Sequence, residues 1–158
     1  MKVLITGAGT GLGRLTALEL AKRGHKVHAG VMSRGEADGF KSYERIAPIE
    51  LDITNAEDRA KAADLSLDVL VNNAGISQLG PLALLPMERV RAVFEVNVFG
   101  TLALTQACVP AMISRGSGRI LFVSSIAGVS AGAISGPYAM SKHAMQAMGS
   151  SLREELAP

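Results

Sequence analysis

The sequence has little cysteine, little net charge and few long apolar runs. Cys108 is the single cysteine, so no internal disulfide can form and a disulfide-stapled secreted domain is excluded. Sixteen basic and fourteen acidic residues leave a formal net charge of +2, without a run of like charges that could follow a nucleic-acid backbone or an anionic membrane. We therefore expect neither nucleic acid nor a membrane surface as a partner.

The longest apolar runs are interrupted by Gly, Ser, Thr or charged residues, so we expect none to approach the roughly 18 residues of a membrane span. The chain begins with MKVLIT, which is typical of a strand from its second residue and leaves no room for a signal peptide. Together with the lone cysteine, these features predict a cytoplasmic protein.

The chain is nevertheless apolar enough for a compact domain. Its 158 residues are 48% hydrophobic and 19% charged, which suffices for one hydrophobic core. Short β-branched runs predict strands over residues 2–6, 26–31, 47–51, 68–72 and 119–124. Helical spacing predicts helices over residues 11–23, about 55–64, 86 to about 114 and 137–156. The polar stretch 33–45 is expected to be a loop with room for a short helix.

The alternation of strands and helices predicts a doubly wound α/β domain. The predicted strands are too uniformly apolar for a sheet with one face in water. Parallel strands need crossovers, which are right-handed and usually helical. We therefore predict one domain over residues 1–158, with a parallel sheet covered by helices on both faces.

A glycine-rich turn joins the first predicted strand to the first predicted helix. The stretch TGAGTGLG places Gly7, Gly11 and Gly13 where backbone amides and a helix N-terminus can approach an anion such as a pyrophosphate. The strict GxGxxG pattern fails because Leu12 takes the place of its third glycine, and the phosphate-loop pattern fails for lack of its Lys-Ser/Thr end. A tight turn without a ligand and the glycine turn of a methyltransferase are the alternatives.

The tip of the second predicted strand carries no acid. In dinucleotide-binding folds an acid about 20 residues after the glycines holds the ribose 2′-hydroxyl, whereas an arginine accommodates a 2′-phosphate. Here the tip is Val31, Met32, Ser33 and Arg34, and Glu36 comes only later. We expect Ser33 and Arg34 to bind a 2′-phosphate with no carboxylate to repel it, which favours NADP over NAD. A solvated loop charge is the alternative for Arg34, and the missing acid also argues against a methyltransferase.

Amides follow the fourth predicted strand. Asn72 and Asn73 precede Gly75 in the stretch NNAG, at the carboxyl edge where a parallel sheet meets its ligand. Amide side chains can also satisfy backbone groups where strands diverge, so a structural role is the alternative, and it is the favoured one for Asn72.

Polar side chains recur further along the chain. Asn97 falls inside an apolar helical stripe, where an unsatisfied amide costs roughly 1 to 3 kcal/mol. The alternative is a kinked helix in which this amide bonds its own backbone. Ser124 and Ser125 end the fifth predicted strand, a position where serines are common.

A tyrosine and a lysine lie four positions apart in GPYAMSKHAM. On a helix, Tyr138 and Lys142 share a face and can reach a common ligand. A free phenol ionises only near pH 10, and an ammonium about 4 to 6 Å away favours the phenolate. The pair therefore suits proton transfer, and a surface tyrosine that covers a lysine stem is the alternative.

These motifs occur in one order: TGxxxGxG, NNAG, the asparagine of NVFG, a serine thirteen residues before a tyrosine, and YxxxK. From residue 2 to the last residue the chain resembles the classical short-chain dehydrogenase/reductase family. The resemblance implies a Rossmann-like sheet with strand order 3-2-1-4-5. It also implies hydride transfer between NADP or NAD and a carbonyl or alcohol substrate, without a metal.

The resemblance further implies roles for single residues. Tyr138 would be the general acid or base, and Lys142 would hydrogen-bond the nicotinamide ribose and favour the phenolate. Ser125 would orient the substrate oxygen, and Asn97 would hold a water that links Lys142 to solvent. Asp52 would contact the adenine and Asn73 the adenosine ribose region. The implied cofactor-binding set is Gly7, Gly11, Leu12, Gly13, Ser33, Arg34, Asp52, Ile53, Asn73, Ala74, Gly75, Tyr138 and Lys142.

The chain departs from the family pattern at its carboxyl end. Members of the family usually continue with a strand that carries a PGxxxT-like segment and with a substrate lid, whereas this sequence stops at LREELAP. We therefore expect it to be part of a longer protein. The resemblance favours dimers or tetramers built from the helices over 86–114 and 137–156. A dinucleotide-binding redox sensor without turnover, or an incomplete fragment, is the alternative to an enzyme.

Overall fold

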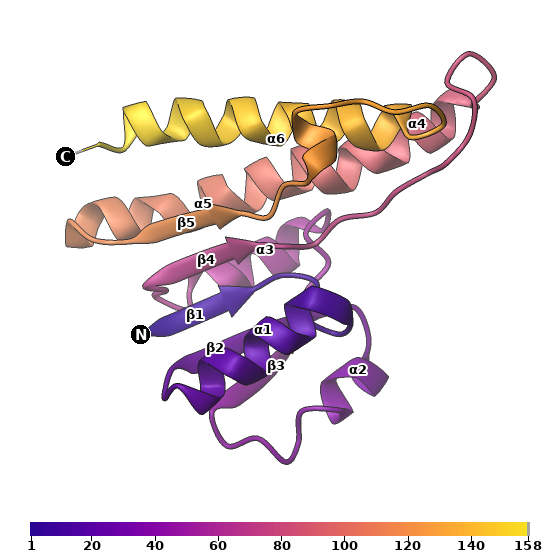
Figure 1. Ribbon diagram of the computed structural model, residues 1–158. Helices are drawn as coiled ribbons and strands as arrows, with labels where there is room; N and C mark the ends of the chain where they lie inside the picture. The colour runs from indigo at the N-terminus through magenta and orange to yellow at the C-terminus, as the bar shows by residue number, and fades with distance from the viewer. Residues whose placement is uncertain (158) are drawn as a thin grey trace.

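The computed structural model of the chain describes residues 1–157 and is built on a parallel five-stranded sheet (Figure 1). The strands are β1 (Lys2–Ile5), β2 (Lys26–Val31), β3 (Ile46–Glu50), β4 (Val69–Asn72) and β5 (Arg119–Phe122). Their order is β3-β2-β1-β4-β5, and every neighbouring pair is parallel. The predicted doubly wound sheet and its strand order are confirmed.

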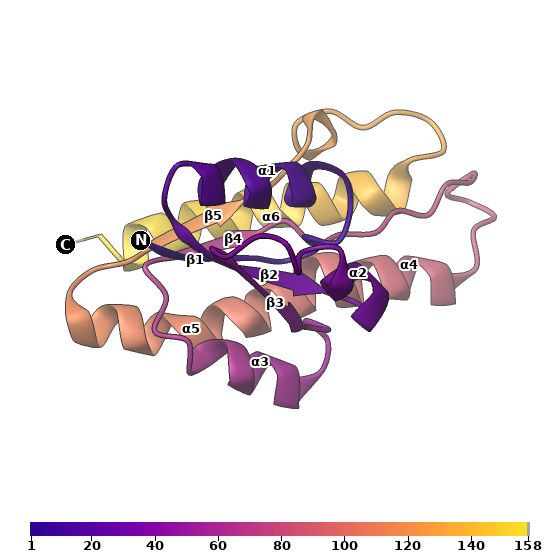
Figure 2. The ribbon, with the colours of Figure 1, turned by 90° about the horizontal axis from the view of Figure 1, so that it is seen from below.

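Helices cover both faces of this sheet, as Figure 2 shows from below. The helices are α1 (Gly11–Lys22), α2 (Arg34–Asp38), α3 (Ala56–Ala63), α4 (Met87–Phe94), α5 (Thr101–Arg115) and α6 (Gly136–Glu155). A π-helical turn, η1 (Glu95–Gly100), joins α4 to α5, and a short 3-10 turn, η2 (Ile126–Gly128), follows β5. Helices α1 and α6 lie on one face, and α3 and α5 lie on the other.

The strands are uniformly apolar because alternate side chains enter two separate cores. Val3 and Ile5 of β1 pack with Ala17 and Ala21 of α1 in one core. Leu4, between them in sequence, packs in the other core with residues of α3 and α5. Successive side chains of a strand point to opposite faces, so both faces of the sheet are buried at its central strand β1.

One prediction about the elements needs correction. The helix predicted over 86–114 is interrupted by the π-helical turn η1. The segment expected to be a loop with room for a short helix does contain one, α2, with Ser33 as its N-cap. Ser33 accepts a hydrogen bond from the amide of Glu36, which is the capping interaction that starts a helix in a polar segment.

The stretch Met87–Arg115 is long and apolar enough to cross a membrane by length and composition. Its most apolar 18-residue window has a mean hydropathy of 1.5 and is 39% buried in the structure. The expectation that no run approaches a membrane span is therefore wrong, because the small polar residues that interrupt this run lower its mean hydropathy only slightly. In this fold Leu104, Cys108 and Met112 of the stretch pack into a core against the sheet.

Strand β5 has a neighbour on one side only within residues 1–157. Its free edge borders a groove of about 1100 Å³ between α5 and α6, lined by residues that include Met112, Phe122 and Met145. Leu121 of this strand is 48% exposed. The groove lies at the edge of the sheet, away from the carboxyl ends of the central strands.

Candidate functional site

The turn between β1 and α1 can be built only with glycine at its key positions. Gly7 and Gly11 have φ angles of +62° and +53°, in the left-handed region that favours glycine. A Cβ on Gly7 would lie 2.9 Å from the α-carbon of Ala74. A Cβ on Gly13 would collide with the carbonyl oxygen of Gly7 and lie 2.5 Å from Asn73 Nδ2. The glycines therefore allow the turn, the start of α1 and the end of β4 to touch.

The same turn leaves the N-terminus of α1 open to a ligand. The N-cap residue, Thr10, makes no capping hydrogen bond with its side chain. A Cβ on Gly11 would meet no other atom within 4 Å, and Leu12 is 72% exposed. Unsatisfied amides and the positive end of a helix dipole attract anions, so this cradle fits the pyrophosphate of a dinucleotide.

We expect replacement of Gly13 by alanine to destabilise this turn, because the added methyl group meets backbone atoms that cannot move away. The loss should be about 2 to 4 kcal/mol of unfolding free energy. Gly35→Ala is the matched control, since its nearest neighbour would be Ser33 Oγ at 3.9 Å. Thermal unfolding of both variants tests this; equal midpoints would contradict the close packing at Gly13.

A carboxylate lies at the tip of β2, contrary to expectation. Glu36 Oε2 accepts a hydrogen bond of 2.9 Å from the amide of Met32. A Cβ on Gly9 would overlap the Glu36 carboxyl group, so this group packs directly on the glycine turn. The prediction that no carboxylate lies near Ser33 and Arg34 is wrong, because the first turn of α2 brings Glu36 back to the strand tip.

Asn73 ties β4 to the glycine turn. Its side-chain nitrogen donates to the carbonyl oxygens of Thr6 at 2.8 Å and Gly7 at 3.2 Å. The amides of Asn73 and Ala74 both donate to the Thr6 hydroxyl. These bonds fix the end of β4 against the glycine turn that follows β1.

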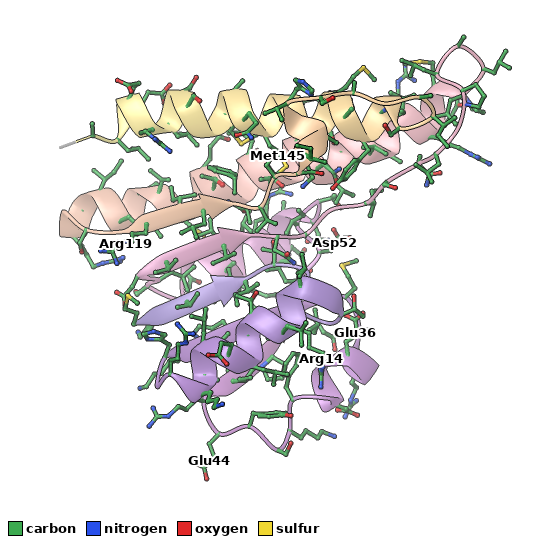
Figure 3. The ribbon with its side chains drawn as sticks, viewed as in Figure 1. Arg14, Glu36, Glu44, Asp52, Arg119 and Met145 are labelled. Atoms are coloured by element: carbon green, nitrogen blue, oxygen red, sulfur yellow. The ribbon has the colours of Figure 1, made fainter. Side chains whose placement is uncertain are left out.

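Two other predicted polar residues have hydrogen-bond partners within the protein. Asn72 is buried and its Nδ2 donates to Thr105 Oγ1 at 3.0 Å, in line with the structural alternative. Asp52 Oδ1 accepts from the amide and the hydroxyl of Thr54, at 2.9 and 2.7 Å. Its neighbour Ile53 is buried in the core beside α3 and α5. Asp52 follows β3 and is labelled in Figure 3.

Tyr138 and Lys142 lie together on α6. Lys142 Nζ is 5.6 Å from the centroid of the Tyr138 ring, and only 3% of Lys142 is exposed. The ammonium donates to the carbonyl oxygen of Val123 at 2.7 Å and contacts Met145 Sδ at 3.3 Å. A Cβ on Gly75 would lie 3.7 Å from this Nζ. The two side chains share one side of the helix, as their spacing predicts.

The Lys142 ammonium is costly where it lies. None of the ion pairs among residues 1–157 includes it. Burial lowers the pKa of Lys142, because desolvation penalises the charged form. A buried cation without a carboxylate destabilises a fold, so its presence calls for a functional reason.

Asn97 occupies the π-helical turn and links three segments. Its Oδ1 accepts from the amide of Ile76 at 2.8 Å, and its Nδ2 donates to the Ile76 carbonyl at 2.9 Å and to Ser141 Oγ at 3.0 Å. Ser141 Oγ in turn donates to the carbonyl oxygen of Tyr138 at 2.7 Å. Asn97 therefore bonds a neighbouring segment rather than its own helix, and it holds the Tyr138 turn through Ser141.

Sequence reasoning missed Ser141. It is fully buried, and it lies three residues after Tyr138 and one before Lys142. A hydroxyl on the face of α6 that carries this pair was the available signal, because helical residues three apart are neighbours.

The two serines after β5 differ in their partners. Ser125 is the N-cap of η2, and its Oγ accepts from the amide of Ala127 at 3.2 Å, so its hydroxyl proton remains available for donation. Ser124 Oγ is buried and has no hydrogen-bond partner among the described residues. Buried hydroxyls without a partner are rare and mark places that a ligand or water completes.

The carboxyl ends of β1, β4 and β5 thus bring together most of the predicted residues. The glycine turn contacts Asn73 and Ala74, and Gly75 lies next to Asn97 and the Lys142 ammonium. Within residues 1–157 no group of three or more His, Cys, Asp or Glu side chains could hold a metal ion.

Comparison with known proteins agrees with this arrangement. A family model described as short chain dehydrogenase matches residues 1–158. The uncharacterized oxidoreductase YbbO of Escherichia coli (strain K12) is 36% identical over 160 residues, which cover 98% of this chain and 60% of that protein. The mitochondrial D-beta-hydroxybutyrate dehydrogenase of Bos taurus is 34% identical over 172 residues, covering 99% of this chain and 50% of that protein.

A solved structure is also similar over nearly the whole chain. A short chain dehydrogenase from Burkholderia cenocepacia J2315 in complex with NADP has a TM-score of 0.91 and 37% identity, covering 99% of this chain and 67% of that one. The chain spans 50% to 60% of the length of the two curated relatives above.

Proposed function

Because this chain belongs to the short chain dehydrogenase family, we propose that it supplies the nucleotide-binding and proton-transfer part of an NAD(P)-dependent oxidoreductase. The reaction is the interconversion of a carbonyl compound and an alcohol. When bound, the nicotinamide donates or accepts the hydride. The substrate is a small molecule.

Tyr138 is the proton donor in the direction of reduction. A carbonyl oxygen gains negative charge as its carbon is reduced, and it needs a proton and a hydrogen-bond donor already aimed at it. The Tyr138 hydroxyl gives the proton, and the free hydroxyl proton of Ser125 supports the oxygen. In the reverse direction the phenolate takes the proton from the alcohol.

Lys142 prepares the phenol for this role. Its ammonium, 5.6 Å from the ring centroid, favours the phenolate through its charge. With a nucleotide bound, it would also donate to the nicotinamide ribose. Asn97 holds the Tyr138 turn through Ser141. It also uses its remaining hydrogen-bonding capacity to bind a water that links Lys142 to solvent.

A nucleotide would bind across the carboxyl edge of the sheet. The glycine turn and the open N-terminus of α1 would hold its pyrophosphate, and Asp52 and Ile53 would border the adenine. At the tip of β2, Arg34 would attract a 2′-phosphate and Glu36 would oppose it, so the nucleotide is NADP or NAD. A related structure from Burkholderia cenocepacia holds NADP, which supports a nicotinamide dinucleotide in this chain.

The observation that carries this proposal is the buried ammonium of Lys142 beside the Tyr138 ring, which forms no ion pair within residues 1–157. The test is to incubate the purified protein with NADPH or NADH and a panel of ketones and aldehydes. We expect at least one carbonyl compound to be reduced, with loss of the absorbance of the reduced nicotinamide. Tight nucleotide binding without turnover on any carbonyl compound would favour a redox sensor instead.

Copies of the chain associate through η1, α5 and α6 in this proposal. Phe99, at the end of η1, and Ile113, on α5, are 56% and 62% exposed, and Met140 of α6 is 39% exposed. Exposed apolar side chains on long helices suit a symmetric interface. The oligomeric state in solution tests this.

A further inference from the structure

A second pocket lies at the edge of the sheet opposite to the glycine turn, where the N label stands in Figure 1. It has a volume of about 630 Å³ and is bordered by the amino ends of β1 and β2, the start of β3 and the end of α3. Its charged and titratable lining residues are Lys2, Lys26, His28, Glu44, Arg45 and Asp64. The glycine turn follows the carboxyl end of β1, so this pocket is separate from the nucleotide crevice proposed above.

Two lysines lie side by side on the sheet at this pocket. Lys2 pairs in register with Lys26, and Leu4 pairs in register with His28. Side chains two residues apart on a strand share a face, so the two lysines and His28 lie on the face to which Leu4 points. That face is the one covered by α3 and α5. Like charges on neighbouring strands repel and destabilise a sheet, so the lysine pair calls for a partner of opposite charge.

The protein does not supply that partner as an ion pair. None of the ion pairs among residues 1–157 includes Lys2, Lys26 or Arg45. Three cations line the pocket against two carboxylates, Glu44 and Asp64, so the lining carries a net positive charge.

The nearby carboxylates leave the lysines available to a ligand. Glu44 is exposed, and Figure 3 shows its labelled side chain pointing outward from the loop. Asp64 is exposed at the end of α3. Asp68, which precedes β4, accepts a hydrogen bond of 2.7 Å from the backbone amide of Lys2 rather than from its ammonium.

His28 adds a neutral hydrogen-bond donor beside these charges. Its Nδ1 is buried and has no hydrogen-bond partner within residues 1–157. Burial lowers the pKa of His28, and the charge of Lys2 lowers it further, so the ring is neutral at pH 7. A buried N–H without a partner is rarer than a buried acceptor without one, so the ring proton belongs on Nε2. The ring lines the pocket and can donate there through Nε2.

We propose that this pocket binds a phosphate group, either free or carried by a small molecule. Lys2, Lys26 and Arg45 supply the charge, and His28 Nε2 donates to a phosphate oxygen. A phosphate suits this set because it carries close to two negative charges and accepts hydrogen bonds from several donors at once. It also replaces the repulsion between the two lysines by attraction to a common partner. This site does not depend on the proposed function, because it lies outside the nucleotide crevice.

The test follows the His28 ring by NMR while inorganic phosphate is added at pH 7 and constant ionic strength, with sodium chloride as the balancing salt. The chain has three histidines, and the variant His28→Phe identifies the His28 signals by their loss. This variant keeps a ring and removes a buried nitrogen that has no partner, so it is expected to fold. We expect the ring nitrogen signals of His28 to shift with phosphate until the shift saturates, and to stay in place with sodium chloride alone. Phosphate bound at the glycine turn is at the other edge of the sheet and leaves these signals unchanged.

Variants of the cations test whether the pocket itself holds the phosphate. Lys26→Met and Arg45→Met should each raise the dissociation constant read from the His28 signals about two- to fivefold, which corresponds to the loss of one exposed ion pair. Lys26→Met also removes the repulsion with Lys2, so it is expected to fold. Lys41→Met is the matched control, because Lys41 is exposed and pairs with Asp38 outside the pocket, and it should leave the constant unchanged.

A parallel titration with glycerol 3-phosphate separates the two sources of the phosphate group. Binding tighter than that of inorganic phosphate assigns the pocket to a phosphorylated small molecule, and equal or weaker binding assigns it to phosphate itself. His28 signals that stay in place, or that move equally with sodium chloride, would overturn the inference. An unchanged dissociation constant in both Lys26→Met and Arg45→Met would overturn it as well. Turnover of nicotinamide nucleotides is measured separately, so the inference and the proposed function can fail independently.

Discussion

Replacing Tyr138 with phenylalanine is expected to lower turnover about 10² to 10⁴-fold, the range that a positioned general acid contributes. The ring stays and only the hydroxyl is lost, so the packing of α6 is preserved. Nucleotide binding should therefore change little. Steady-state rates with a carbonyl compound found in the panel, together with nucleotide dissociation constants, measure both effects.

The chain provides a matched control for this variant. Tyr43 is its other tyrosine, and its exposed ring packs edge-on against Phe40, away from the crevice. Tyr43→Phe removes the same atom and should leave turnover unchanged. Equal turnover of Tyr138→Phe and wild type would rule out Tyr138 as the proton donor.

Replacing Lys142 with methionine is expected to remove function and to stabilise the fold. Methionine keeps the length of the buried stem, and it removes an ammonium whose pKa is lowered by desolvation. The Val123 carbonyl loses a donor, at a cost of about 1 to 3 kcal/mol, which offsets part of the gain. Turnover should fall about 100-fold or more, because both the ribose contact and the charge beside the phenol disappear.

The pH dependence of stability shows whether the burial of the ammonium is the cause. An unfolded lysine titrates near pH 10.4, and the folded pKa of Lys142 is lower, so the unfolded state binds the extra proton between the two values. The wild type is therefore destabilised at neutral pH and recovers stability as the pH rises through the folded pKa. The advantage of Lys142→Met should shrink towards pH 10 or so.

Denaturant unfolding of both proteins over a range of pH measures this difference. Lys41→Met is the control, because Lys41 is exposed and pairs with Asp38 on the surface. Its effect on unfolding free energy should be within about 0.5 kcal/mol at every pH. A pH-independent loss of stability in Lys142→Met would mean that Lys142 is a structural residue.

The fold was predictable because apolar residues at successive strand positions indicate that both faces of the strand are buried. The run KVLI is apolar at successive positions, and in the structure Val3 and Ile5 enter one core while Leu4 enters the other. Few arrangements other than a sheet covered on both faces bury side chains at successive positions of a strand. The glycine turn was predictable for a similar reason, since Gly7 and Gly11 adopt the left-handed backbone that only glycine tolerates well.

The site was predictable where neighbours in sequence act together. Tyr138 and Lys142 are one helical turn apart, so their proximity follows from helix geometry. Glu36 could not be placed in this way, because its position depends on a helix that begins in a polar segment with a weak pattern. The bond joins Glu36 to Met32, and only the structure shows that α2 begins between them, at Arg34.

Asn97 and Ser141 show a second limit of sequence reasoning. Their hydrogen bond joins residues 44 positions apart, and the π-helical turn that aims Asn97 at Ile76 has no distinctive sequence signal. The polar residue inside an apolar stripe correctly indicated a special position. Its partners came from segments that helical periodicity cannot relate.

The account depends on Lys142 and Tyr138 facing a bound nicotinamide together. A crystal structure of the protein with NADP or NAD bound tests this most directly. We predict Lys142 Nζ within about 3.2 Å of a hydroxyl of the nicotinamide ribose, with the Tyr138 hydroxyl beside the nicotinamide ring. A nucleotide bound elsewhere, or a crevice in which both side chains point away from the nicotinamide, would contradict the account.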